Sequence, residues 1–139
     1  MAWRLAVIGD PIAHTLSPLI QGKIMEKLGV EGDYAACHVR PEELGRFTEY
    51  ARENLDGFNI TIPHKSAVIP FLDEIDAYAQ SCGAVNTVRV RDGKLCGFNT
   101  DGDGIRAALE QMGAPFAGSR VALLGAGGAA RSICRKALD

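Results

Sequence analysis

Three apolar runs alternate with two segments of helical periodicity near the start of the chain, and this rhythm limits the possible folds more than any other feature. The runs cover 4–9, 33–39 and 57–62, and the helices between them are expected at 18–28 and 42–54. Strands that alternate with helices pair in parallel, because each helix returns the chain across the sheet with a right-handed crossover. We therefore expect an α/β fold with a mostly parallel sheet and helices on both faces.

An antiparallel hairpin is the strongest local signal that follows. Two strand-like runs, 84–91 and 94–99, flank Asp92-Gly93, a pair suited to a tight hairpin turn. The hairpin makes the expected sheet mixed. Because the turn lies at one end of the hairpin, Asn86 and Asp101 should meet at the other end.

Local signals also place the ends of several elements. Ser17 is expected to cap the first helix, Pro18 to be its first residue and Gly29 to end it. Pro63 should end the strand 57–62, because proline has no N–H for the next ladder bond. Further helices are expected at 66–72, interrupted by a proline, at 76–81 and from 101 to 112.

A glycine-rich turn near the end of the chain has the spacing of a dinucleotide-binding fingerprint. Gly125, Gly127 and Ala130 lie between a predicted strand at 120–124 and a predicted helix, which is the context that the motif requires. Small residues there let the backbone approach a pyrophosphate at a helix N-terminus, whereas the alternative interpretation is simply a tight turn. We interpret 1–101 as one domain and 102–139 as the incomplete start of a Rossmann domain.

Composition excludes several classes of function. The 15 basic and 17 acidic residues nearly balance, so no field suited to nucleic acid or a membrane surface is expected. The four cysteines form no C-x-x-C pair and no Cys/His spacing suited to a metal, which favours a reduced, cytoplasmic protein. His14 and His64 have no nucleophile or metal partner in the pattern and are interpreted as loop residues.

Polar side chains follow the strands at the edge where ligands bind in open α/β sheets. Lys65 beside Asp101 could handle the proton released from an oxidised alcohol, and the hydroxyl and amide groups suit a small polyol acid. Each residue also has a structural interpretation: Lys65 could be solvated, Asp101 could cap its helix and Asn86 could satisfy a strand edge. The candidate site residues are Thr15, Ser17, Thr61, Lys65, Asn86 and Asp101.

Five segments, in this order, carry a resemblance to a known family: HTLSP (14–18), NITIPHK (59–65), GAVNT (83–87), GFNTDGDG (97–104) and GAGGAAR (125–131). The chain resembles the amino-terminal half of shikimate dehydrogenases. The resemblance implies an NADP-dependent oxidoreductase that interconverts 3-dehydroshikimate and shikimate in aromatic amino-acid biosynthesis. The chain departs from the family at Asp10, where asparagine is usual, and at Thr15, where serine is usual.

The resemblance also implies a role for each matching residue. Lys65 and Asp101 would be the catalytic pair, Thr15 and Ser17 would bind the substrate carboxylate, and Thr61, Asn86 and Asp101 would bind its hydroxyl groups. The cofactor would lie on Gly125, Ala126, Gly127, Gly128 and Ala129.

Two alternative functions remain open at the level of sequence. One is a quinate/shikimate dehydrogenase, and the other is a non-catalytic sensor of a shikimate-pathway ligand. We expect the 139-residue chain alone to be inactive, because 120–139 holds only one strand and one helix of a nucleotide-binding half. That strand would lack neighbours, so self-association through it is a further expectation.

Overall fold

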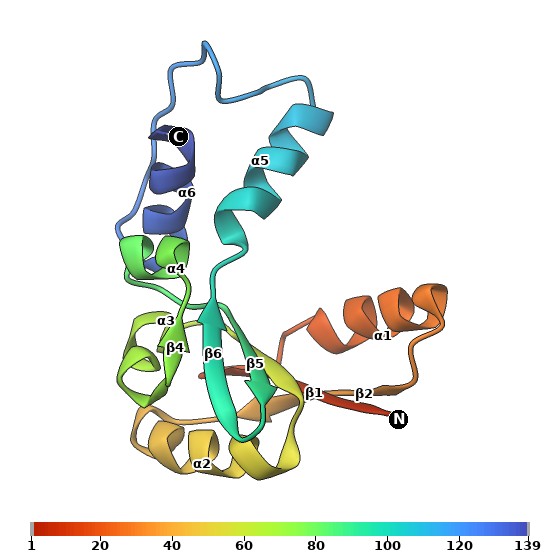
Figure 1. Cartoon of the computed structure of the whole chain (residues 1–139). Helices are drawn as coiled ribbons and strands as arrows, with labels where there is room; N and C mark the ends of the chain where they lie inside the picture. The colour runs from red at the N-terminus through yellow and green to blue at the C-terminus, as the bar shows by residue number, and fades with distance from the viewer. Residues whose placement is uncertain (1, 139) are drawn as a thin grey trace.

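The computed structural model describes residues 2–138 and contains a mixed six-stranded sheet (Figure 1). The order across the sheet is β2-β1-β3-β5-β6-β4. β1 pairs in parallel with β2 and β3, β4 pairs in parallel with β6, and β5 is antiparallel to both β3 and β6. The strands are β1 (Trp3–Gly9), β2 (Gly32–His38), β3 (Gly57–Ile60), β4 (Glu74–Ile75), β5 (Thr87–Arg91) and β6 (Lys94–Phe98).

The helices alternate with the strands in the first half of the chain and follow them in the second. α1 and α2 lie on opposite sides of the sheet, and α5 and α6 rise together from one end of it (Figure 1). The expected α/β fold with helices on both faces is therefore confirmed. The helices are α1 (Ser17–Leu28), η1 (Pro41–Glu43), α2 (Leu44–Asn54), α3 (His64–Ala67), η2 (Ile69–Phe71), α4 (Ala77–Cys82), α5 (Asp101–Gln111) and α6 (Gly128–Leu138).

The hydrophobic core lies between the sheet and α2. Alternate residues of the central strands, including Ile8, Phe58 and Val88, contribute fully buried side chains, and Leu44 and Ala51 meet them from α2. The core holds the four central strands in register, so the loops at their ends are presented by a rigid frame.

Three details of the expected elements are wrong. Ser17 is the first residue of α1 and not its cap, and the Thr15 hydroxyl instead accepts a hydrogen bond from the Ser17 N–H at 3.2 Å. The third strand ends at Ile60, since Thr61 already starts the turn that leads into α3. The two-residue strand β4 was not expected, because so short an element has no periodicity of its own.

The strand expected at 120–124 is not formed. Residues 119–127 contain no strand, although α6 begins at Gly128 as expected. Val121 is 51% exposed and Leu124 98% exposed. A strand needs a neighbour to pair its backbone groups, and no other segment of residues 2–138 lies beside this one in a ladder. Among those residues, no helix is long and apolar enough to cross a membrane.

Candidate functional site

The carboxyl ends of β1 and β3 lie side by side and open the site. The Thr61 N–H donates to the Ile8 carbonyl at 2.9 Å, and the Asp10 N–H donates to the Ile62 carbonyl at 3.0 Å. A side chain at Gly9 would come within 2.5 Å of the Thr61 methyl group, so this position requires glycine. The loop that carries Thr15 therefore starts beside the end of β3, as expected for an edge where ligands bind.

Lys65, Asp101 and Asn86 form the centre of the site. The Lys65 ammonium donates to one oxygen of the Asp101 carboxylate at 2.5 Å, and the Asn86 amide donates to the other oxygen at 2.7 Å. The Lys65 and Asp101 side chains are only 16% and 23% exposed. The structure thus brings together the two residues that the sequence suggested as a catalytic pair, with the carboxylate held from both sides.

Different elements deliver these three side chains to one place. Lys65 is in the first turn of α3, Asn86 immediately precedes β5, and Asp101 is the first residue of α5. The Val85 N–H donates to the Lys65 carbonyl at 2.7 Å, which fixes α3 against the start of the hairpin. Asp101 also lies at a helix N-terminus, where a carboxylate is favoured.

The expected hydroxyl groups make no hydrogen bond to Lys65, Asn86 or Asp101 among the residues that the structure describes. The Thr15 hydroxyl donates to the Ser17 hydroxyl at 3.1 Å, and both side chains are half-buried in the loop after β1. Thr61 is also half-buried, and its hydroxyl has no hydrogen-bond partner among residues 2–138. These hydroxyl groups therefore have free hydrogen-bonding capacity for a ligand.

A polar network behind Asn86 was not expected from the sequence. The Asn59 amide donates to the Thr87 hydroxyl at 3.1 Å, and its oxygen accepts from the Tyr34 hydroxyl at 2.6 Å. The Thr87 hydroxyl in turn donates to Asn86 at 3.0 Å. Burial raises the pKa of Tyr34 to about 12. Period-two alternation along β3 places Asn59 on the same face as Thr61, which was the available signal.

His64 is the second residue that the sequence interpretation misplaced. It lies in α3 and is fully buried, not in a loop. Its Nε2 lies 2.6 Å from the Val39 carbonyl, which can only accept, so Nε2 carries the proton. This bond fixes the start of α3, and hence Lys65, against the chain that follows β2.

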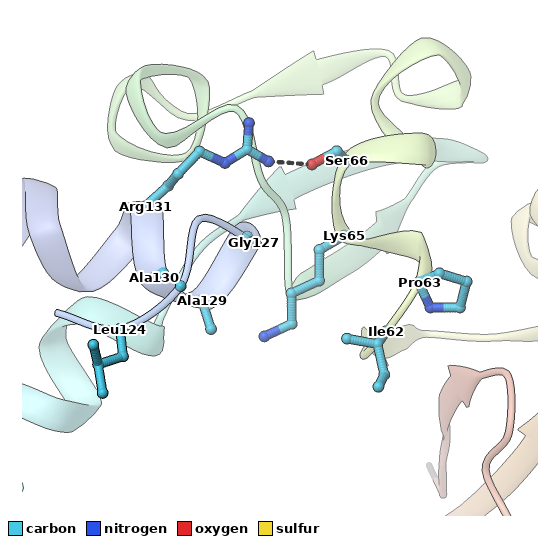
Figure 2. Close-up of a pocket in the computed structure, with 11 residues that line it drawn as sticks. Ile62, Pro63, Lys65, Ser66, Leu124, Gly127, Ala129, Ala130 and Arg131 are labelled. Atoms are coloured by element: carbon cyan, nitrogen blue, oxygen red, sulfur yellow. Dashed lines mark hydrogen bonds between the residues drawn. The ribbon is translucent and has the colours of Figure 1, made fainter.

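The glycine turn lines a cavity of about 510 Å³ together with Lys65 (Figure 2). Gly125 has φ +125°, a conformation that favours glycine. A side chain at Gly127 would meet open space, whereas one at Gly128 would lie 3.2 Å from the Lys65 Cβ. The lining residues are Ile62, Pro63, Lys65, Ser66, Leu124, Gly125, Gly127, Gly128, Ala129, Ala130 and Arg131; of the five expected cofactor residues, only Ala126 is not among them.

The chemistry of this cavity suits an anionic group. No carboxylate lines it, whereas Lys65 and Arg131 do, and the first N–H groups of α6 have no partner within the helix. The Arg131 guanidinium donates to the Ser66 hydroxyl at 2.5 Å, as Figure 2 shows. The arrangement fits a phosphate-bearing cofactor whose reactive end would lie toward Lys65.

Fold and site together define an α/β substrate-binding domain whose ligand edge faces a glycine turn with the spacing of a dinucleotide-binding fingerprint. A family model described as "Shikimate dehydrogenase substrate binding domain" matches residues 7–88, and the chain belongs to this family.

Relatives and solved structures agree with this assignment. The NADP(+) shikimate dehydrogenase of Geobacter metallireducens is 48% identical over 130 residues, which cover 92% of this chain and 46% of that protein. Shikimate 5-dehydrogenase from Thermus thermophilus, solved with NADP(H) and shikimate, has a TM-score of 0.93 at 42% identity, covering 99% of this chain and 52% of the other. The 5-ketofructose reductase of a Gluconobacter strain has a TM-score of 0.88 at 36% identity, covering 99% and 50%. The chain spans about half the length of the curated relatives it matches.

Proposed function

We propose that this chain provides the substrate-binding and proton-transfer half of an NADP-dependent shikimate dehydrogenase, which reduces 3-dehydroshikimate to shikimate in aromatic amino-acid biosynthesis. The observation that carries the proposal is the Lys65–Asp101 pair, with a 2.5 Å contact, directly beside the glycine turn. Two relatives that are 48% and 49% identical over most of this chain are named NADP(+) shikimate dehydrogenases, which supports the proposal.

The proposed roles follow from the chemistry of each side chain. When the ketone is reduced, its oxygen gains negative charge, and the Lys65 ammonium donates a proton to it; in the reverse direction Lys65 takes the proton from the hydroxyl. Asp101 holds the ammonium in place, and together with Asn86 and Thr61 it binds the substrate hydroxyls. Thr15 and Ser17 bind the substrate carboxylate through their hydroxyl groups.

The proposed cofactor residues are Gly125, Ala126, Gly127, Gly128 and Ala129. Backbone N–H groups at the start of α6 would bind the pyrophosphate, and NADP, when bound, supplies or accepts the hydride. We propose that 1–101 is the substrate-binding domain and that 102–139 starts the cofactor domain. The α5 helix, which begins at Asp101, and the glycine turn support this boundary.

The same site could also accept a related polyol. A quinate/shikimate dehydrogenase would use the same residues for one more hydroxyl, and the resemblance to a 5-ketofructose reductase indicates that the fold serves other hydroxyketones. Comparison of kcat/KM for shikimate and quinate distinguishes these functions. A sensor without catalytic activity would bind shikimate but give no turnover with either substrate.

The test uses a fusion enzyme, defined as residues 1–139 joined to the carboxyl-terminal half of the Geobacter metallireducens relative. It should oxidise shikimate with NADP, and Lys65→Ala should lower kcat by at least ~10²-fold with a small change in KM, because a proton donor acts chiefly in the transition state. Lys23→Ala, at an exposed position of α1, is the matched control and should leave kcat unchanged. A Lys65→Ala kcat within a few-fold of the parent enzyme would contradict the catalytic role.

The unfused chain should fold and bind shikimate weakly, and it should not reduce NADP. The exposed segment around Leu124 supports this proposal, because the walls of a nucleotide site would have to come from further strands. Turnover by the purified chain close to that of the fusion enzyme would contradict it.

We further propose that the unfused chain self-associates weakly through 120–124 and that the protein is cytoplasmic. Exposed Val121, Leu123 and Leu124 support the first statement, and the four cysteines, all free, support the second. Size-exclusion chromatography of Leu124→Lys tests the association: the variant should elute later than the parent chain at high concentration.

A further inference from the structure

Asn99 is a buried amide that joins three parts of the site, although no role has been given to it so far. It follows β6 and is 6% exposed. Its Nδ2 donates to the Ala84 carbonyl at 2.9 Å and to the Ser132 hydroxyl at 2.7 Å, and its Oδ1 accepts from the Asp101 N–H at 3.0 Å. Both amide protons are therefore used, and each bond reaches a different segment of the chain.

Ser132 continues this network into the cofactor turn. Its side chain is fully buried, and its hydroxyl accepts from Asn99 and donates to the Gly128 carbonyl at 2.8 Å. Its own carbonyl accepts from the Tyr78 hydroxyl at 2.7 Å, which ties the same turn of α6 to α4. Ser132 thus links the first residue of α6 to the substrate-binding part of the chain.

The network closes on itself through the catalytic pair. Gly128 packs so tightly against Lys65 that a Cβ there would lie 3.2 Å from the Lys65 Cβ, and Lys65 contacts Asp101. The path from Asp101 through Asn99, Ser132, Gly128 and Lys65 therefore returns to Asp101. If Asn99 or Ser132 moves, the distance between the glycine turn and the proton donor Lys65 has to change.

The junction leaves little freedom for such a displacement. A side chain at Gly102 would come within 1.9 Å of the Tyr78 hydroxyl and 3.0 Å of the Ser132 carbonyl. Gly102 thus allows α5 to approach the Ser132 turn of α6, where a side chain at this position would also come within 3.0 Å of the Lys136 Cβ. Burial and full hydrogen bonding make this polar cluster a rigid one.

We propose that Asn99 and Ser132 are positioning residues that fix the Asp101 carboxylate and the cofactor-binding turn relative to each other. The inference rests on the proposed function and deepens it. Hydride and proton must reach the carbonyl carbon and oxygen of one substrate together, so the turn and the Lys65–Asp101 pair must keep a fixed separation. A misplacement of about 1 Å is enough to lower the rate by up to ~10²-fold.

The first test measures hydrogen exchange at the Asp101 amide in residues 1–139, independently of activity. Ser132→Ala removes the acceptor that holds the Asn99 amide, and the Asp101 N–H should exchange about fivefold faster. Ser119→Ala is the control, because Ser119 makes a local bond to the Pro115 carbonyl outside this network; it should leave that exchange rate unchanged. An unchanged rate in Ser132→Ala, or an equal increase at all amides of β6 and α5, would overturn the proposal.

The second test measures the split between kcat and KM in the fusion enzyme. Ser132→Ala should lower kcat about tenfold, with KM for shikimate within about twofold of the parent value. Asn99→Asp, which removes both donors, should have a larger effect in the same direction. A rise in KM with unchanged kcat would overturn the positioning role. If the parent fusion enzyme binds shikimate without turnover, the proposed function fails, and the exchange experiment still decides whether the network positions Asp101.

Discussion

The Lys65–Asp101 pair should contribute measurably to the stability of the chain, and a double-mutant cycle can quantify the contribution. Lys65→Met removes the charge and keeps most of the apolar stem, and Asp101→Asn keeps the shape of the side chain. Exposed ion pairs contribute up to about 1 kcal/mol, whereas breaking a fully buried pair costs about 3–5 kcal/mol. At 16% and 23% exposure the pair lies between these limits, and the Asn86 amide still satisfies Asp101 when Lys65 is changed. We therefore expect a coupling energy of about 1–2 kcal/mol.

Urea denaturation of residues 1–139 at pH 7 measures this coupling. Each single variant should lower the urea midpoint without changing the slope, and the double variant should be less destabilised than the sum. The exposed pair Arg106–Glu110, at 2.9 Å and one helical turn apart, is the control and should give about 0.5 kcal/mol or less. A Lys65–Asp101 coupling no larger than that of the control pair would show that the contact contributes nothing in solution and would refute the reasoning.

Three further predictions concern individual positions. Gly102→Ala should lower the free energy of unfolding by about 1–3 kcal/mol, because the new methyl group would overlap the Tyr78 hydroxyl. Gly104→Ala, in the same helix but with open space around it, should raise the free energy of unfolding by about 0.5–1 kcal/mol. Thermal denaturation of the two variants compares these effects. Tyr34 should titrate near pH 12 when its ionisation is followed by ultraviolet absorbance. Because its pKa in the folded state lies above the unfolded value near 10, the contribution of Tyr34 to stability should be lost as pH rises from 10 to 12. A folded-state titration midpoint near pH 10 would contradict this prediction. Thr15→Ala in the fusion enzyme should weaken binding of shikimate by about fivefold but leave binding of an analogue without the carboxylate unchanged; equal losses would refute the carboxylate role.

Much of the frame could be predicted because its signals are local. Asp92 and Gly93 have φ of +52° and +72°, the left-handed conformations that an Asp-Gly hairpin turn requires, so two residues were enough to place β5 and β6. Gly29 likewise ends α1 with φ +65°. The meeting of Lys65 and Asp101 followed from topology, since β3 and β6 both run antiparallel to β5, which lies between them, and therefore end at the same edge of the sheet.

The remaining features depend on partners that are distant in the sequence. Asn99 is 33 residues from Ser132, and no pattern in either segment reports that they share a hydrogen bond. The strand expected at 120–124 has the composition of a strand but no neighbour to pair with, so propensity alone could not form it. Ser17 does not cap α1, because it is itself the first helical residue and its N–H donates to the Thr15 hydroxyl.

The attachment of α6 implies that the protein could be made in two pieces. The segment 112–127 between α5 and α6 is exposed, with Leu124 98% accessible, whereas α6 is held by Ser132, Arg131 and the 2.8 Å Lys136–Asp103 ion pair. Protease cleavage within this segment should therefore leave the fragment that contains α6 bound to the rest of the chain. By the same reasoning, a separately synthesised peptide of 126–139 should reassemble with residues 1–113.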